Sequence, residues 1–186
     1  HLHAVIPGHR FDAVVERNNA HPIRGRLTDG ARAEGWAVYL EEAVMNAGLL
    51  DDKLRVRELI YLFGIFRAAR MPADVWLQLN VMTADEVADY WIERVPYLDR
   101  DVARVDAEIY LRRPPGYGLG YTTGMLQMQS LLAERKRQLG DAFSLKDFHD
   151  EFMAAGRLPL SLIHWEMTGD DKGIAGLWSR EPLPVD

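Results

Sequence analysis

Residues 33–42 read Ala33-Glu34-Gly35-Trp36-Ala37-Val38-Tyr39-Leu40-Glu41-Glu42, and this stretch decides the fold class. Apolar residues in and around it recur at helical spacing on one stripe, which is made of Ala33, Trp36, Ala37, Leu40, Val44 and Ala47. Thr28 is the predicted N-cap and Gly48 the predicted stop, so we expect a helix that ends at Asn46. The same periodicity returns along the chain, and no segment shows the two-residue alternation of a strand. The sequence therefore predicts an all-α, multi-helix protein.

The other helices are predicted from their start and stop signals. They run from 51 or 52 to about 70, from a capping box at 83–86 to about 94, from 99 to 112, from about 120 to 138, from 145 to 155 after a Ser144 cap, and from 158 to about 167. Met71-Pro72 is expected to end the first of these, because the residue before proline disfavours helical geometry. We predict one helical domain over residues 1–170 and an irregular tail over residues 171–186.

Composition limits the classes of function. The 186 residues suffice for one domain, and folding at this size buries roughly 70% of the surface of the unfolded chain. The absence of cysteine excludes disulfides and thiolate ligands, and the net charge of -6 without a basic stripe argues against nucleic acid. The longest apolar run, residues 59–66, is too short to span a membrane and reads as a core helix. We expect a soluble chain; no signal peptide is visible, and the compartment stays unknown.

Histidines are concentrated at the start of the chain, where His1, His3 and His9 account for three of the six. His3 and His9 suggest a metal site, although on an ideal helix their six-residue spacing separates them by about 120°. Pro7-Gly8 between them could distort the helix enough to bring the two together. The alternative is a pair of ordinary, partly buried histidines. His1 is the weaker candidate because it is terminal.

Glu34 is the second notable residue, because it borders the apolar stripe, where an unpaired carboxylate is costly to bury. A metal or an arginine would remove that cost, and Gly35 lets another group approach closely. The alternative is a first-turn glutamate that the helix dipole favours. The segment 116–120 is rich in glycine but follows no strand, which argues against a phosphate loop. His149 and His164 are more typical of hydrogen-bonded structural histidines.

Several motifs follow one another in a familiar order. They begin with His3-Ala4-Val5-Ile6-Pro7-Gly8-His9-Arg10 and Glu34-Gly35-Trp36-Ala37-Val38-Tyr39, and continue at 67–70, 74–78, 115–124, 148–150 and 156–160. In this order they resemble the C-terminal part of a bacterial family known as domain of unknown function 885 (DUF885), which is similar to zinc metallopeptidases. The resemblance implies a zincin-related helical fold, usually longer, with an N-terminal portion outside these residues. It also implies a zinc or other divalent metal on His3, His9 and Glu34, with Tyr121 and His149 as wall residues that polarise a substrate carbonyl.

Three polar positions depart from the family pattern. Ala4 replaces the catalytic glutamate, Arg10 the second of two adjacent histidines, and Gln78 a later histidine. If Arg10 replaces a metal ligand, the site is abolished, because a guanidinium cannot ligate. Loss of a general base alone costs about 10²–10⁴ in rate.

These departures predict a divergent metallopeptidase-like domain whose peptide hydrolysis is lost or altered. One alternative is a non-enzymatic helical module that binds a small peptide, a small molecule, a partner chain or a missing N-terminal portion. Another is an active metal-dependent hydrolase that uses Glu41 or Glu42 as its base.

Overall fold

A computed structural model describes residues 1–178 of the protein, and within these residues the chain is helical without strands. The elements are α1 (His9–Arg17), η1 (Arg24–Arg26), α2 (Gly30–Asn46), α3 (Leu54–Gln78), α4 (Ala84–Arg94), α5 (Arg100–Leu111), α6 (Tyr117–Leu139), η2 (Gly140–Ala142), α7 (Leu145–Ala154), α8 (Leu160–Thr168) and α9 (Lys172–Trp178). The predicted all-α class is confirmed.

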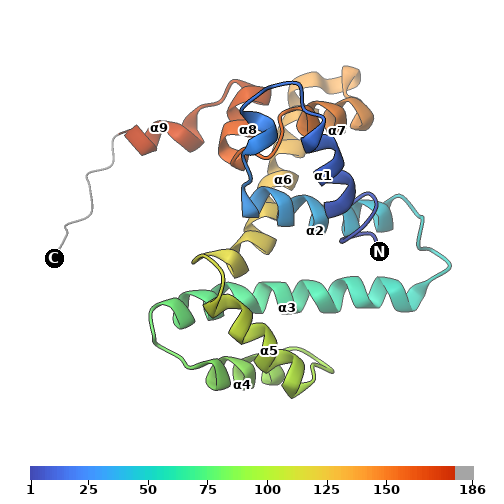
Figure 1. The fold of residues 1–186 in the computed structure, drawn as a ribbon. Helices are drawn as coiled ribbons and strands as arrows, with labels where there is room; N and C mark the ends of the chain where they lie inside the picture. Colours follow the sequence, from blue (N-terminus) through green and yellow to red (C-terminus); the bar gives the residue numbers. More distant parts are fainter. Residues whose placement is uncertain (179–186) are drawn as a thin grey trace.

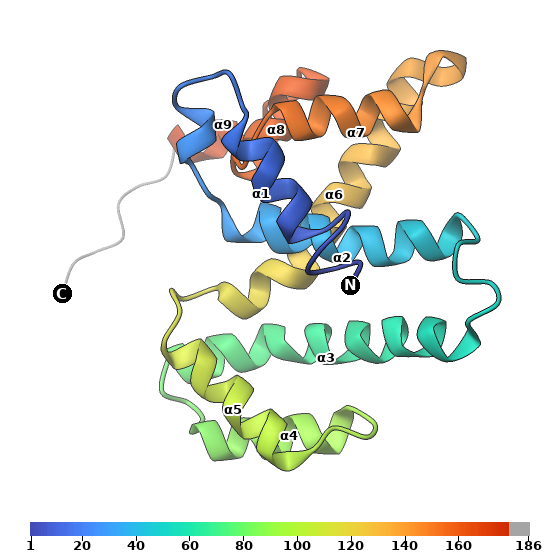
Figure 2. The ribbon, with the colours of Figure 1, turned by 45° about the vertical axis from the view of Figure 1, so that its right-hand side comes forward.

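Two groups of helices are joined by α6, as Figures 1 and 2 show. In one group α3, α4 and α5 pack around a core that includes Phe66, Trp91 and Tyr110. In the other, α2, α6, α7 and α8 enclose a second core, which includes Trp36 and Phe152. Helix α1 lies beside α2 and α7 in this second group. Because α6 contacts both α2 and α3, it fixes the two groups against each other.

Helices α2 and α6 cross where two glycines meet. A Cβ atom added at Gly35 would lie 2.4 Å from the carbonyl carbon of Gly124, and one added at Gly124 would lie 2.1 Å from the carbonyl oxygen of Ala31. No side chain fits between the backbones at these distances, so the crossing requires glycine on both helices. The close approach predicted at Gly35 is confirmed, and the approaching group is the backbone of α6.

Two of the predicted helix caps are confirmed, those of α4 and α7. Thr83 and Glu86 form the reciprocal capping box of α4, and the Ser144 hydroxyl accepts from the backbone N–H of Asp147 at the start of α7. The predicted Thr28 cap is wrong by one residue, because Asp29 accepts the backbone N–H of Arg32 at 2.7 Å. The other helix limits differ from the prediction by a few residues.

The predicted break at Met71-Pro72 is wrong, because α3 continues through Pro72 to Gln78. A proline inside a helix removes one N–H and crowds the preceding turn. Here the indole of Trp91 donates to the carbonyl oxygen of Ala69 at 3.0 Å, and Ala69 itself is buried in the core of this group. The carbonyl that Pro72 leaves without its helical partner is that of Ala68, so this bond does not replace the lost one. The bond and the burial of Ala69 and Ala73 pack this stretch of α3 against α4, which stabilises the helix across the proline.

The predicted irregular tail is wrong for residues 172–178, which form α9. Ile174 on this helix is buried, at 7% exposure, so α9 has an apolar contact with the rest of the fold. Residues 179–186 lie outside the described part of the chain.

The apolar run at residues 59–66 is helical as predicted, but most of it is not core. Leu59, Tyr61, Phe63 and Ile65 are between 44% and 59% exposed, and only Ile60 and Phe66 of this run are buried. The N-terminal half of α3 extends beyond α4 and α5 (Figure 1), and within it residues 59–66 contain no charged side chain. None of the helices in residues 1–178 is both long and apolar enough to cross a membrane.

Candidate metal centre

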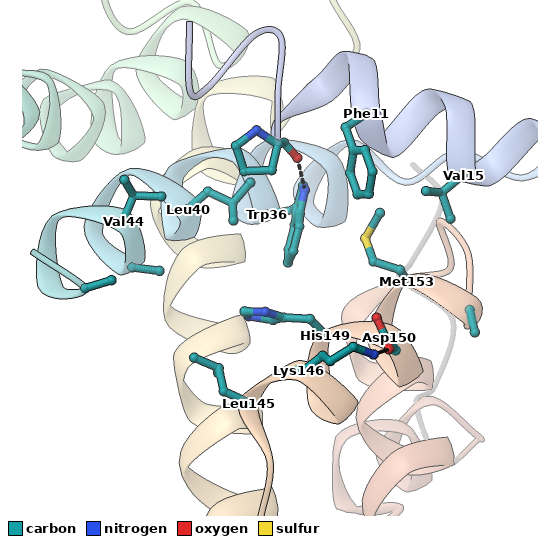
Figure 3. A pocket seen from close by; sticks show the side chains of 14 residues that line it. Phe11, Val15, Trp36, Leu40, Val44, Leu145, Lys146, His149, Asp150 and Met153 are labelled. Atoms are coloured by element: carbon teal, nitrogen blue, oxygen red, sulfur yellow. Dashed lines mark hydrogen bonds and ion pairs between the residues drawn. The ribbon is translucent and has the colours of Figure 1, made fainter. Parts of the chain in front are cut away.

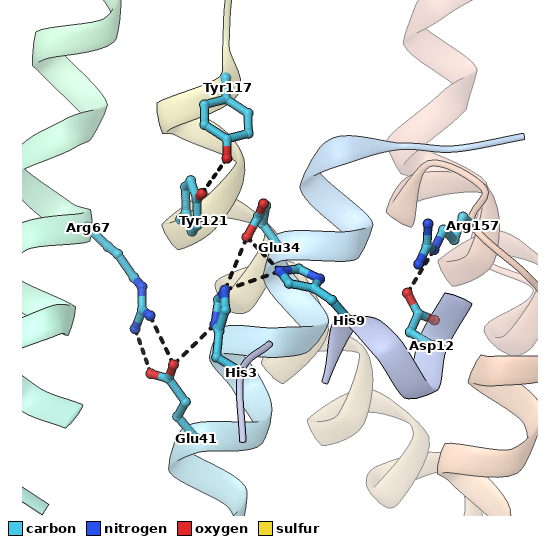
Figure 4. A network of polar contacts seen from close by, with 9 residues as sticks. All are labelled: His3, His9, Asp12, Glu34, Glu41, Arg67, Tyr117, Tyr121 and Arg157. Carbon is cyan, nitrogen blue, oxygen red and sulfur yellow. Dashed lines mark hydrogen bonds and ion pairs between the residues drawn. The ribbon is translucent and has the colours of Figure 1, made fainter. Parts of the chain in front are cut away.

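Three side chains converge where the N-terminal segment meets α2. His3 precedes α1, His9 is the first residue of α1, and Glu34 lies in the first part of α2 (Figure 4). Nε2 of His9 lies 3.2 Å from Nε2 of His3 and 3.2 Å from Oε2 of Glu34, and the third distance, from His3 Nε2 to Glu34 Oε2, is 3.4 Å. Among residues 1–178 this is the one group of three such ligand atoms close enough to hold a metal ion.

The N-terminal segment folds back to bring His3 to His9. The backbone N–H of His9 donates to the carbonyl of His3 at 2.9 Å, and a Cβ atom at Gly8 would lie 1.8 Å from that carbonyl oxygen. The indole N–H of Trp36, two residues after Glu34, donates to the carbonyl of Pro7 at 3.1 Å. Gly8 therefore permits the turn, and Trp36 fixes it to α2.

A buried ion network fixes α1 against α2 as well. Asp12 on α1 is 2% exposed and accepts from Arg32 at 2.7 Å and from Arg157 at 2.8 Å. Because Arg32 lies two residues before Glu34, this network sets the position of His9 relative to Glu34. Removal of one partner from a buried ion pair leaves an uncompensated charge, at a cost of about 3–5 kcal/mol. Sequence reasoning missed this network, whose partners are up to 145 residues apart.

The three atoms have the spacing that a tetrahedral zinc site requires. Zinc binds imidazole nitrogen and carboxylate oxygen at about 2.0–2.1 Å, so adjacent ligands of a tetrahedron lie about 3.3–3.4 Å apart. The observed distances of 3.2, 3.2 and 3.4 Å are close to that edge. Two imidazoles and one carboxylate also form a known donor set for zinc that is open at its fourth position. The residues therefore fit a zinc-like ion.

The charges at the cluster favour an ionised carboxylate. Burial would raise the pKa of Glu34, but His3 and His9 outweigh it and lower the pKa to about 2. Burial would lower the pKa of His3, but its contacts with Glu34 and Glu41 outweigh that effect and raise it above 6.5. Glu34 is thus charged at neutral pH, as a metal ligand must be.

Glu41 has two partners on the far side of His3 (Figure 4). Its carboxylate accepts two hydrogen bonds from Arg67, at 2.6 and 2.9 Å, and its Oε1 lies 3.1 Å from Nδ1 of His3. Burial would raise the pKa of Glu41, but His3 and Arg67 lower it below its usual value. Glu42 is held separately by Gln129, whose amide donates to it at 2.8 Å. Both alternative bases named above are therefore engaged elsewhere.

Tyr121 lies beside the cluster, as the resemblance implies. Its ring stacks on that of His3 with 6.4 Å between centroids, and its hydroxyl shares a 2.7 Å hydrogen bond with that of Tyr117. Burial and the nearby Glu34 carboxylate raise the pKa of Tyr121. The hydroxyl therefore stays protonated and can donate a hydrogen bond. Its role as a catalytic wall residue stays a prediction.

His149 lies in a different environment, an apolar cavity of about 720 Å³ between α1, α2 and α7 (Figure 3). Nε2 of His149 shares a 2.8 Å hydrogen bond with the Tyr39 hydroxyl, and its ring lies edge-on to Trp36. Burial lowers the pKa of His149, so it is neutral at physiological pH. These contacts are those of a hydrogen-bonded structural histidine. The role that the resemblance implies for His149, which is to polarise a substrate carbonyl, stays a prediction.

The three positions that the resemblance marks as departures contribute no atom to the cluster of His3, His9 and Glu34. Ala4 and Arg10 are exposed, and their backbones share a 3.3 Å hydrogen bond. Gln78 donates to the carbonyl of Tyr110 at 3.0 Å near the end of α3. His3, His9 and Glu34 thus converge in this chain with alanine at position 4, arginine at position 10 and glutamine at position 78.

The glycine-rich segment at 116–120 meets a carboxylate of the protein itself. Buried Asp74 on α3 accepts the backbone N–H of Gly118 at 2.8 Å and lies 3.4 Å from that of Leu119. The start of α6, where a phosphate loop would bind an anion, is therefore occupied by Asp74. His164 likewise has a partner in the protein, Glu134 at 2.8 Å.

Fold and site together define one class of protein, a helical domain with a His-His-Glu cluster between its N-terminal segment and α2. The family described as "Bacterial protein of unknown function (DUF885)" matches residues 1–167, so the chain belongs to the DUF885 family. No curated protein matches the chain.

Two solved structures are similar to the chain, and each is described as a "putative lipoprotein". The one from Colwellia psychrerythraea has a TM-score of 0.82 and 27% identity over 90% of this chain, and the one from Shewanella oneidensis, of unknown function, has a TM-score of 0.73 and 25% identity over 89%. The chain spans 28% and 30% of their respective lengths.

Proposed function

We propose that this domain binds one divalent metal ion, of the zinc type, through His3, His9 and Glu34. The observation that carries the proposal is the near-equilateral triangle of their three ligand atoms, with sides of 3.2, 3.2 and 3.4 Å. A bound ion of this type supplies Lewis acidity to a coordinated oxygen. Tyr121 is placed to donate a hydrogen bond to a group that lies beside His3.

We further propose that standard peptide hydrolysis is lost or altered. Alanine at position 4 cannot accept a proton, and the nearby Glu41 is held by Arg67 while Glu42 is held by Gln129. A glutamate whose pKa is lowered by an arginine is a weak base, so Glu41 is a poor substitute for the missing carboxylate. The domain is thus expected to keep the ligands and lack the base.

Zinc titration of chelator-treated protein, followed by calorimetry, tests the metal proposal. We expect one zinc per chain, and His9→Ala and Glu34→Gln should each lower the affinity by more than about tenfold, because each removes a ligand. His21→Asn is the matched control: His21 is exposed, and its Nδ1 accepts from the backbone of Ile23 at 3.2 Å, which asparagine can also do. Elemental analysis of protein purified without a chelator that finds no stoichiometric zinc, iron or manganese would refute the proposal.

The exposed apolar surface of α3 favours a second candidate function, a binding role for the same domain. Phe63 is 51% exposed and Ile65 44%, and a helix that is apolar around its circumference is normally buried. The solved relatives are about three times as long, so a further helical region, either in the same polypeptide or in a partner, is the proposed cover. Light scattering tests this role: a clean monomer that binds no hydrophobic dye would contradict it.

A further inference from the structure

Glu41 joins α3 to the candidate metal centre through two buried partners. Arg67 of α3 donates from both of its terminal nitrogens, at 2.6 and 2.9 Å, so the carboxylate is held in one orientation. Glu41 is 7% exposed and Arg67 is 8% exposed, so solvent does little to screen the pair. The oxygen that receives the longer of these bonds, Oε1, is also the one that faces His3.

The two ring nitrogens of His3 face different groups. Nδ1 lies 3.1 Å from Oε1 of Glu41, and Nε2 faces His9 and Glu34 at 3.2 and 3.4 Å. The contact at Nδ1 is a close charge contact that lies outside the angular limits of a hydrogen bond. A neutral imidazole carries one N–H, and a carboxylate held by Arg67 can only accept. Glu34, which faces Nε2, also only accepts, but it lies farther from the ring, at 3.4 Å against 3.1 Å for Glu41, and His9 can donate to Nε2 of His3 across 3.2 Å. The N–H of neutral His3 is therefore favoured at Nδ1, which leaves the lone pair on Nε2.

We infer that Glu41 is a positioning residue, which holds His3 in its Nδ1–H tautomer with the Nε2 lone pair directed at His9 and Glu34. Arg67 fixes the carboxylate in turn. This replaces the earlier alternative in which Glu41 acts as a general base. The consequence for metal affinity rests on the proposed function, whereas the tautomer of His3 does not.

The tautomer can be measured in the metal-free wild-type protein. Nitrogen-15 NMR at a pH where the imidazoles are neutral distinguishes Nδ1–H from Nε2–H, and the His3 signals are assigned with a His3→Gln variant. We expect Nδ1–H. A predominant Nε2–H form of His3 would overturn the inference whether or not the protein binds zinc. This measurement does not depend on the folding of any Glu41 variant.

Glu41→Gln tests the same point by substitution. The amide oxygen should turn to Arg67, which only donates, so the amide N–H faces Nδ1 of His3 and shifts the proton to Nε2. The expected results are an Nε2–H signal for His3 and a zinc dissociation constant raised about 10–100-fold. The matched control is Glu42→Gln, the same change at the next residue, where the partner is Gln129; it should leave both readouts unchanged.

The outcomes separate the two proposals. If the wild type binds no zinc but His3 carries its proton on Nδ1, the metal proposal fails and the positioning role stands. If zinc binds and Glu41→Gln leaves both the tautomer and the affinity as in the wild type, the positioning role fails and the metal proposal stands.

Discussion

Gly35→Ala should separate α2 from α6 next to Glu34. The new Cβ would lie 2.4, 2.6 and 2.8 Å from backbone atoms of Gly124. Carbon atoms in contact lie about 3.5–4.0 Å apart, so the helices must move by about 1 Å. Overpacking of this kind costs about 1–3 kcal/mol, and the upper end applies because backbone cannot rotate away. Alanine returns about 1 kcal/mol of helix propensity, so we expect the free energy of unfolding to fall by about 2 kcal/mol.

Gly64→Ala is the matched control for this substitution. Gly64 lies inside α3, and a Cβ atom added there meets nothing within 4 Å, so the same change should raise the free energy of unfolding by up to about 1 kcal/mol. Urea denaturation followed by tryptophan fluorescence gives both values, and the difference between the variants should be about 3 kcal/mol. A Gly35→Ala protein as stable as Gly64→Ala would refute the claim that the crossing requires glycine.

Three further results are expected. Ala4→Glu should create or raise hydrolysis of small peptides by the zinc-loaded protein, because a general base contributes about 10²–10⁴ in rate; no change would mean that the site differs by more than one residue. In the metal-free protein, the raised pKa of His3 gives stability that is present below pH 6.5 and lost as pH rises through that pKa. The Glu34 pKa of about 2 gives stability that is present above pH 4.5 and lost as pH falls through about 2, so Glu34→Gln should flatten both limbs of a melting-temperature profile against pH. Phe63→Ser with Ile65→Ser should change the free energy of unfolding by less than about 1 kcal/mol, but it should abolish hydrophobic-dye binding or self-association. Dye binding or self-association that persists in this variant would show that α3 is not the surface involved.

Local chemistry made most of the fold predictable from the sequence. Thr83 and Glu86 cap α4 with atoms three residues apart, and Ser144 starts α7 in the same way, so neither depends on the rest of the fold. Pro72 shows where this reasoning ends. The proline is a local signal for a break, but Trp91, whose indole binds the carbonyl of Ala69, comes from another helix. The sequence contains no local sign that this partner will be present.

The exposed half of α3 was mispredicted for a related reason. An apolar run predicts burial, and the sequence around Phe63 does not say which surface will bury it. Within residues 1–178 the rest of the fold covers the later half of α3, which carries Phe66 and Leu77, and one side of its earlier half, where Ile60 packs with Met45 and Leu50. The pattern was read correctly as helix, but the burial of Phe63 was not, because these residues are 44–59% exposed along most of the run.

The cluster itself depends on a turn, and helical periodicity does not decide it. The 120° estimate applies to two residues on one helix, but α1 begins at His9, so His3 lies outside it. What sets their distance is Gly8, where any side chain would collide with the carbonyl of His3 at 1.8 Å. The Pro7-Gly8 step could therefore be identified in advance as the point of distortion, but the direction of the turn could not. That direction is set by Trp36, whose indole holds the Pro7 carbonyl from the same helix that carries Glu34. The third candidate ligand and the anchor of the first two thus lie on one rigid element, which is why a six-residue spacing unfavourable on a helix is compatible with convergence here.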